Sequence, residues 1–162
     1  MHRRIGIRAA QRGMTLIELL IALVIVGILT AVALPPYTRY QERSYAAQAM
    51  ADLGTCAQAI ERHYTVNFTY AGAADDGGGN AVATGAPLAT TCPATSPPRG
   101  TALFDISITA ADATQFTLRA TPIAGAAAAG VGMLEIDATG VRRWDKNADG
   151  DFADAGENDW EI

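Results

Sequence analysis

The sequence predicts an α+β fold in which a long N-terminal helix packs against a small antiparallel β-sheet. Three observations predict this fold. The chain of 162 residues contains an uncharged run of twenty residues, Leu19–Thr38, near its start. Apolar residues then recur every three or four positions as far as Tyr64, which places them on one face of a helix. After residue 100, short segments alternate between apolar and polar residues, as half-buried strands do.

The charged residues are unevenly distributed along the chain. The formal net charge is −5, but the first thirteen residues contain four arginines and no acidic residue. The remaining residues include eight basic and seventeen acidic side chains. Because nucleic-acid phosphates need a basic surface, this acidic body makes nucleic acid an unlikely main partner.

The uncharged run could be a membrane-spanning helix, a plain membrane anchor or part of a secretory signal peptide. As a helix it would be roughly 30 Å long, about the thickness of the hydrocarbon core of a bilayer. A signal peptide is disfavoured because the run is long and is followed by Pro35-Pro36-Tyr37 rather than by a small-residue cleavage site. Glu18 precedes the run, and a plain anchor leaves this acid unexplained. A carboxylate at bilayer depth is expensive and indicates a function.

The residues Gly13-Met14-Thr15-Leu16-Ile17-Glu18, followed by the apolar run, resemble the class III signal of type IV prepilins. The resemblance implies that prepilin peptidase removes a basic leader, residues 1–13, by cutting after Gly13, and that Met14 is then N-methylated. It also implies a pilin fold. Residues 14–38 would be the half of the stem helix that first spans the inner membrane and then enters the filament core.

Glu18 lies one helical turn from Met14, so the α-amino group created by cleavage could pair with it in a monomer held in the membrane. The resemblance implies that, in the filament, Glu18 pairs instead with the N-terminus of a neighbouring subunit. Pro35 lacks a backbone N–H and Gly27 lowers helix propensity, so the stem is expected to stretch easily between them. In the pilins that this chain resembles, that part of the stem unwinds in the filament. A simple helix kink is the alternative.

Residues 39–67 are predicted to form the amphipathic half of the stem helix, with an apolar stripe that contacts the sheet. The stripe consists of Ala46, Met50, Leu53, Ala57, Ile60 and Tyr64. Residues 68–100 are rich in Gly, Ala, Thr and Pro and are predicted to form a long surface loop. In position this loop matches the variable segment that joins stem and sheet in pilins.

Residues 101–144 are predicted to form an antiparallel sheet whose apolar face covers the stem. The expected strands are Ala102–Thr109, Thr114–Thr121, and Gly132–Thr139 turning into Val141–Trp144. In the first strand, Phe104, Ile106 and Ile108 are expected to face inward.

Cys56 in the stem and Cys92 in the long loop are predicted to form a disulfide, because an exported body is exposed to oxidising conditions. The bridge would contribute roughly 3–4 kcal/mol by chain entropy. Two independent buried thiols are the alternative. Many pilins place their bridge nearer the C-terminus, where this chain has no cysteine.

The segment 145–162 is predicted to be an acidic C-terminal loop that binds calcium. Asp145, Asn147 and Asp149 place side-chain oxygens at every second position, and Gly150 follows, as in the first half of an EF-hand loop. The second half departs from that pattern, because the twelfth position is Gly156 and Glu157 comes one residue late. A solvated acidic turn is the alternative. The expected calcium ligands are Asp145, Asn147, Asp149, Asp151 and Glu157.

No Ser-His-Asp, Cys-His or paired-carboxylate arrangement is evident in the sequence, so an enzyme is not expected. The resemblance implies a structural subunit of the type IV pilus, most similar to a minor pilin, that supports pilus biogenesis, adhesion or twitching motility. Its partners would be other pilin subunits, the inner-membrane assembly machinery and the peptidase, and it would end in the extracellular pilus. A calcium-binding major pseudopilin of a type II secretion system is one alternative. A DNA-uptake pilin is another, but it needs a basic stripe and the head offers only Arg99, Arg119, Arg142, Arg143 and Lys146.

Overall fold

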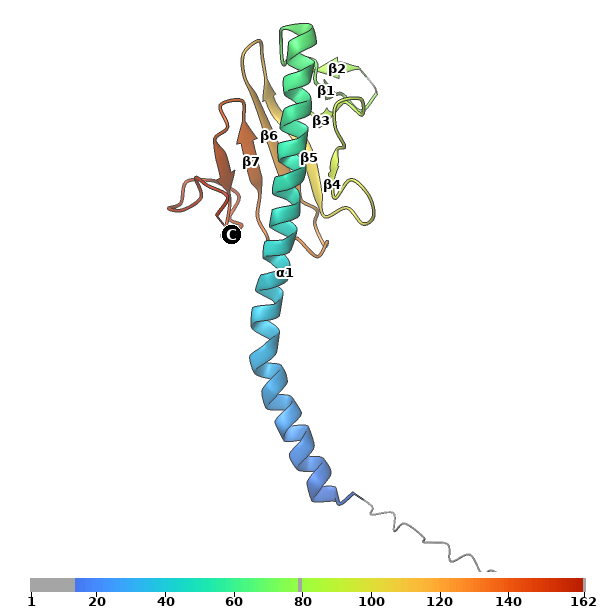
Figure 1. Ribbon diagram of the computed structural model, residues 1–162, viewed down its shortest axis with the longest axis vertical. Helices are drawn as coiled ribbons and strands as arrows, with labels where there is room; N and C mark the ends of the chain where they lie inside the picture. Colours follow the sequence, from blue (N-terminus) through green and yellow to red (C-terminus); the bar gives the residue numbers. More distant parts are fainter. Residues whose placement is uncertain (1–13, 79, 162) are drawn as a thin grey trace, which may run out of the picture. The chain divides into compact units, whose positions relative to one another are not determined.

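The computed structural model describes residues 14–78 and 80–161, and for residues 32–36 it describes the backbone alone. Helix α1 extends over Leu16–Asn67 (Figure 1). The chain divides into two compact units between Thr38 and Arg39, so α1 contributes to both. The second unit contains every strand that the structure describes.

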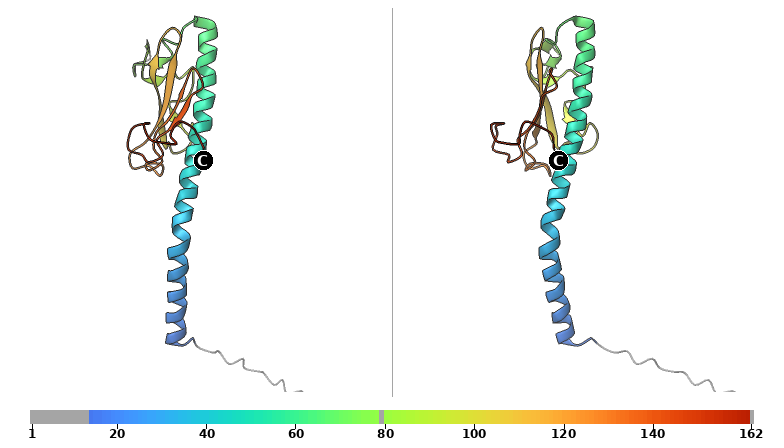
Figure 2. Two further views of the ribbon diagram at one scale, coloured as in Figure 1. Left: turned by 90° about the vertical axis from the view of Figure 1, so that its left-hand side faces the viewer. Right: turned by 60° about the vertical axis from the view of Figure 1, so that its left-hand side comes forward.

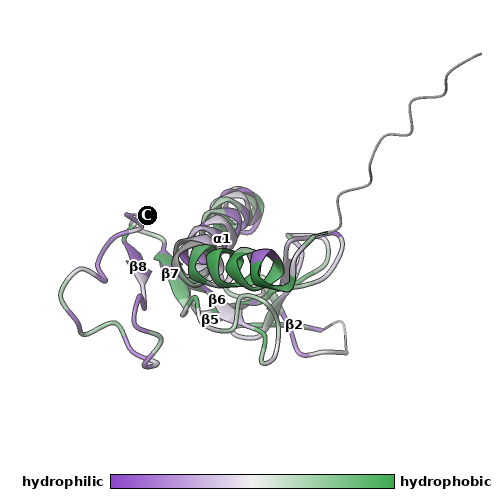
Figure 3. Ribbon diagram, turned by 90° about the horizontal axis from the view of Figure 1, so that it is seen from below, coloured by the Kyte–Doolittle hydropathy of each residue, from purple (hydrophilic) through white to green (hydrophobic). Residues whose placement is uncertain are grey.

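The first unit contains the beginning of α1. Thr15 caps the helix, because its Oγ1 accepts a hydrogen bond from the backbone N–H of Glu18 at 3.3 Å. The large apolar side chains from Leu16 to Leu29 are between 51% and 76% exposed. Figure 3 colours these first turns mainly as hydrophobic. Within the described residues, no helix is both long and apolar enough to cross a membrane.

The second unit combines the C-terminal half of α1 with two antiparallel sheets. The small sheet has the order β2-β1-β3, and the larger one has the order β4-β5-β6-β7-β8. Figure 2 shows the larger sheet lying along one side of this half of α1. The strands are β1 (Ala74–Asp75), β2 (Ala81–Val82), β3 (Ala86–Pro87), β4 (Thr95–Ser96), β5 (Phe104–Ala111), β6 (Phe116–Pro122), β7 (Leu134–Asp137) and β8 (Arg142–Trp144).

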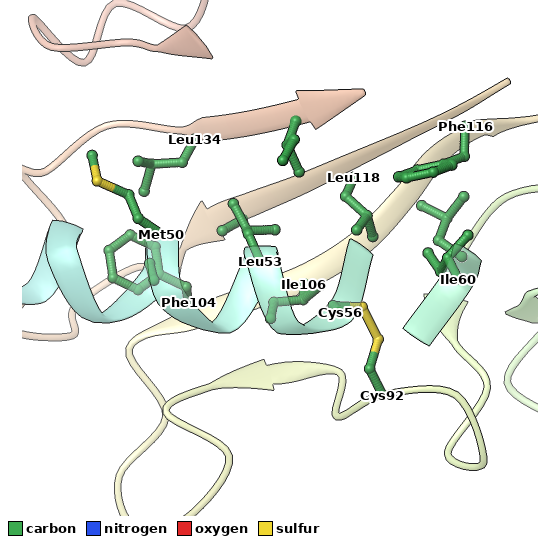
Figure 4. Packing of buried hydrophobic residues seen from close by; sticks show 14 of the residues in the cluster. Met50, Leu53, Cys56, Ile60, Cys92, Phe104, Ile106, Phe116, Leu118 and Leu134 are labelled. Carbon is green, nitrogen blue, oxygen red and sulfur yellow. A yellow bond between two sulfur atoms is a disulfide. The ribbon is translucent and has the colours of Figure 1, made fainter. Parts of the chain in front are cut away.

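The hydrophobic core lies between α1 and the larger sheet (Figure 4). Leu53 and Ile60 of α1 are completely buried against inward-facing side chains of β5, β6 and β7. These sheet residues include Phe104, Ile106, Ile108, Phe116, Leu118, Leu134 and Ile136. Each large apolar side chain removed from water in this way contributes about 1.5–3 kcal/mol. The predicted α+β fold and the predicted alternation on β5 are therefore confirmed.

Residues 68–100 contain more structure than the loop expected from the sequence. Strands β1, β2, β3 and β4 all lie in this segment, and β4 pairs with β5 as an edge strand of the larger sheet. Each has only two residues, too few for an alternating pattern to be recognised. Their chain path depends on glycine: at Gly85 φ is +139°, and an added Cβ would lie 2.6 Å from the carbonyl oxygen of Asp75.

The described part of the chain after β8 forms neither helix nor strand, but it is tied to the larger sheet by backbone hydrogen bonds. The N–H of Trp144 donates to the carbonyl of Glu157 at 2.8 Å, and the N–H of Asp145 donates to Met133 at 2.9 Å. Gly132 permits this close approach, because a Cβ at that position would overlap the carbonyl oxygen of Asp145.

Candidate functional site

The predicted processing motif lies at the start of α1. Gly13 is outside the described residues, while Met14 directly precedes the helix and is 62% exposed. Glu18 is also exposed and stands in the first turn, at the third position after the capping residue Thr15. This geometry leaves the Glu18 carboxylate accessible to a cation outside the subunit.

Of the two residues predicted to weaken the stem, Gly27 is described fully and Pro35 only in its backbone. The helix is continuous through both positions. A Cβ added at Gly27 would meet no heavy atom within 4 Å, so packing in this chain does not require glycine there. Its role in stretching the stem stays a prediction.

The predicted disulfide is present between Cys56 and Cys92, whose Cα atoms are 5.3 Å apart. Cys56 lies on the buried face of α1, and Cys92 follows a turn in which the N–H groups of Thr91 and Cys92 both donate to the carbonyl of Leu88. Figure 4 shows the bridge at the edge of the core. The disulfide therefore fastens the segment before β4 to the stem.

The acidic loop after β8 is held together by its own side chains. Both carboxylate oxygens of Asp145, which is 1% exposed, accept backbone N–H groups, from Asp149 and Gly150 at 3.1 Å each. Glu157 is 2% exposed and accepts the N–H of Asp154 at 3.2 Å. The amide of Asn147 donates to the carboxylates of Asp149 and Asp154 at 2.8 and 2.7 Å.

These bonds bring the predicted calcium ligands into one loop but satisfy them with protein donors. Within the described residues, no group of three or more His, Cys, Asp or Glu side chains is arranged to hold a metal ion. Asp149 and Asp151 are exposed and accept backbone N–H groups of the loop. Calcium binding at this loop stays a prediction.

A buried carboxylate on β7 organises the outer face of the larger sheet. Glu135 stands opposite Arg119 of β6 and Arg143 of β8 in the strand register. Its two oxygens bind the guanidinium groups at 2.8 and 2.6 Å, and its side chain is 5% exposed. The ring of Phe152, from the acidic loop, lies 5.6 Å from the Arg119 guanidinium. This cluster was not predicted from the sequence, although three charges of alternating sign on adjacent strands could have indicated it.

Local contacts shift the pKa values of several ionisable side chains of the head, among them Tyr70 and Asp137. Burial and the nearby Glu61 carboxylate, which accepts the Tyr70 hydroxyl at 3.1 Å, raise the pKa of Tyr70. Burial acts to raise the pKa of Asp137, but hydrogen bonds from Thr139 and Val141 outweigh it and lower that pKa.

Three of the five cations that a basic stripe on the head would need form ion pairs with carboxylates of the same chain. Arg119 and Arg143 bind Glu135, and Lys146 binds Asp159 at 3.0 Å. The Arg142 guanidinium lies 5.0 Å from the centre of the Trp160 ring. The structure therefore does not assemble the five predicted cations into one unpaired stripe.

Arg62, near the end of α1, is a further basic residue of this unit. In the structure it lines a groove of about 280 Å³ together with His63, Asn67, Thr90 and Thr91. Cys92, directly after Thr91, is the only signal in the sequence that could have indicated this grouping, because its bridge to Cys56 brings the loop to the stem.

A single long helix, with an exposed apolar first half and a second half packed on an antiparallel sheet, defines the pilin class of stem-and-head proteins. Residues 8–34 match the model of the prokaryotic N-terminal methylation motif. Residues 35–130 match the family model described as "Type IV minor pilin ComP, DNA uptake sequence receptor". This second match covers more than half of the chain, so the protein belongs to the ComP family of type IV minor pilins.

Curated relatives are similar over about a third of the chain. The type IV major fimbrial protein FimA of Dichelobacter nodosus is 44% identical over 54 residues, which are 33% of this chain and 35% of FimA. The fimbrial protein EcpC of Eikenella corrodens is 41% identical over 59 residues, 36% of this chain and 39% of EcpC. A fimbrial protein of Pseudomonas aeruginosa is 42% identical over 52 residues, 32% of this chain and 34% of that protein. The match thus spans little more than a third of these relatives.

Proposed function

We propose that this chain is a structural, non-enzymatic subunit of a type IV pilus, and specifically a minor pilin. The observation that carries the proposal is the match of residues 8–34 to the methylation motif, a segment that includes the first turns of α1 with their exposed apolar side chains. Because the exposed apolar side chains from Leu16 to Leu29 form a continuous surface, we expect other subunits or lipid to cover it. The match of residues 35–130 to a minor pilin family supports the choice of a minor subunit.

In the proposed assembly pathway, prepilin peptidase cuts after Gly13 and Met14 is N-methylated. The subunit waits in the inner membrane, and the assembly machinery then moves it into the extracellular filament. The exposed Glu18 carboxylate pairs there with the N-terminal amine of a neighbouring subunit. A buried ion pair of this kind sets the register of neighbouring helices more than it adds stability.

Replacement of Glu18 tests this assembly step. Glu18→Gln is expected to leave the subunit in the membrane and remove it from sheared pili, because an uncompensated amine would enter the apolar filament core. Glu42→Gln changes another exposed glutamate of α1 and serves as the matched control. Immunoblots of sheared pili and of membranes measure both fractions. Equal amounts of the Glu18 and Glu42 variants in pili would contradict the proposal. A secretion defect with normal pili on deletion would favour the pseudopilin alternative.

DNA binding is the second candidate function, and the description of the matched family is the observation that favours it. The three ion pairs of the head and its acidic composition oppose it, so binding is expected to be weak and strongly dependent on salt. Fluorescence anisotropy of a labelled short duplex, titrated with the full chain in detergent at two salt concentrations, tests it. An anisotropy that does not change at low salt would exclude this function.

A further inference from the structure

The groove between the end of α1 and the segment before Cys92 has an unusual set of lining side chains. Its polar members are Arg62, His63, Asn67, Thr90 and Thr91, and its other members are apolar. All five polar side chains can donate hydrogen bonds, and none is a carboxylate. This composition suits an oxyanion, which accepts hydrogen bonds through every oxygen.

The positive charge at this groove is not neutralised within the described chain. Arg62 is exposed and makes no salt bridge to any described residue. The neighbouring carboxylate, Glu61, is engaged elsewhere, since both its oxygens accept the hydroxyl of Tyr70 at 3.1–3.2 Å. The Arg62 guanidinium is therefore available for a charge-assisted hydrogen bond to a ligand.

His63 provides an independent indication that a hydrogen-bond partner is missing here. Its Nε2 atom is buried and has no hydrogen-bond partner, and it is the one such side-chain atom among the described residues. Buried polar atoms in folded proteins are nearly always paired, so an unpaired one calls for a ligand or another explanation. The same side chain lines the groove, so the unpaired nitrogen belongs to a residue of the candidate site.

The groove is also fixed in place by covalent structure. The disulfide joins Cys92 to the stem, and the turn closed by the Thr91 N–H and the Leu88 carbonyl at 2.7 Å sets the path of Thr90 and Thr91. On the stem side, the amide of Asn67 donates to the carbonyl of His63 at 3.0 Å. The donors are thus held on two segments that cannot separate while the bridge is intact.

A cleft at the other end of this half of α1 is less suited to an anion. It is lined by Arg39, Arg43 and Lys146, but Glu42 and Glu161 line it too. Its carboxylates offset its cations, whereas the groove at Arg62 contains no carboxylate.

We propose that the groove formed by Arg62, His63, Asn67, Thr90 and Thr91 binds a phosphate group, either free or in the backbone of DNA. Arg62 supplies the charge, and the imidazole and the two hydroxyls supply further donors. Only the choice of DNA as the carrier rests on the DNA-binding function proposed above.

Nuclear magnetic resonance of His63 tests the site in the full chain in detergent micelles. His2 and His63 are the two histidines of the sequence, so the change His2→Gln leaves His63 as the single imidazole reporter. Inorganic phosphate and a short DNA duplex are added separately at constant pH, with sodium chloride at matched ionic strength as the reference. Phosphate is expected to shift the His63 ring nitrogens in a saturable manner that chloride does not reproduce.

Arg62→Gln is expected to weaken phosphate binding about tenfold or more, because it removes a charged donor. Arg99→Gln, which alters an exposed arginine outside the groove, is the matched control and should bind like the parent chain. Reduction of the disulfide should also weaken binding, since it releases Thr90 and Thr91.

The possible outcomes separate the site from the DNA-binding function. Saturable shifts with phosphate but none with DNA would support the site and count against DNA binding. DNA binding without any change at His63, and unaffected by Arg62→Gln, would overturn the site and leave DNA binding intact. The absence of a response to either ligand would overturn the site.

Discussion

Glu135 is the most deeply buried charge on the outer face of the larger sheet, and both of its oxygens bind arginine. Simple alternation places it on the opposite face of β7 from Leu134 and Ile136, which is expected to be solvated. It is nevertheless buried, because side chains of the neighbouring strands reach over it. A buried ion pair stabilises the fold little more than apolar side chains of similar size would. Removal of one partner is strongly destabilising, because the other charge is then buried without a counter-charge.

Glu135→Gln is expected to lower the free energy of unfolding by about 3 kcal/mol, because Arg119 and Arg143 lose their counter-charge in a partly buried position. The effect lies at the lower end of the usual range because these arginine side chains are 34% and 36% exposed. Urea denaturation measures it. Asp105→Asn on β5, an exposed carboxylate in no salt bridge to a described residue, is the control. Equal stability of both variants would show that the cluster is not stabilising.

Asp137 gives the head a pH dependence at acid pH. Its carboxylate accepts the N–H groups of Thr139 and Val141 at 2.9 and 3.1 Å, and its pKa is lowered in the folded state. Its contribution is therefore complete above the unfolded pKa of about 4 and is lost as the pH falls through the lower folded value. The difference in melting temperature between the parent chain and Asp137→Asn should shrink between about pH 6 and about pH 3. A constant difference would contradict this role.

At the scale of elements, the disulfide is the main constraint on the segment between α1 and β5. The bridged cysteines are 36 positions apart. The bridge reduces the conformational entropy of the unfolded chain and thereby raises the free energy of unfolding by roughly 3–4 kcal/mol. The double change Cys56→Ser and Cys92→Ser is expected to lower the melting temperature by roughly 10 °C. Reductant should lower the melting temperature of the parent chain and leave that of the variant unchanged. A reductant effect on the variant would point to another cause.

The C-terminal loop provides the test of the calcium prediction. If calcium binds, it should raise the melting temperature of the full chain over that in chelator by several degrees, since a ligand that binds only the folded state stabilises it. Asp149→Asn should abolish the difference, while Asp76→Asn, an exposed acid in the segment before β2, should retain it. Identical midpoints with calcium and with chelator would show that the loop is held by its internal hydrogen bonds alone.

At the scale of the whole molecule, local periodicity was sufficient for the large elements. The three- and four-residue spacing of Met50, Leu53 and Ile60 predicted the buried face of α1, and the alternation of Phe104, Ile106 and Ile108 predicted that of β5. Strands β1 to β4 could not be predicted in this way, because two-residue strands depend on long-range pairing. Arg62 was missed as a site residue because its neighbours in the groove come from a segment that only the folded disulfide brings near.

In the proposed mechanism, a cleaved and methylated N-terminus begins the stem and drives assembly. Intact-mass analysis of the protein purified from its pili tests it most directly. We expect a chain that begins at Met14, lacks residues 1–13 and is one methyl group heavier than its sequence. A protein that keeps Met1 in cells with an active prepilin peptidase, and that is absent from sheared filaments, would contradict this assembly mechanism.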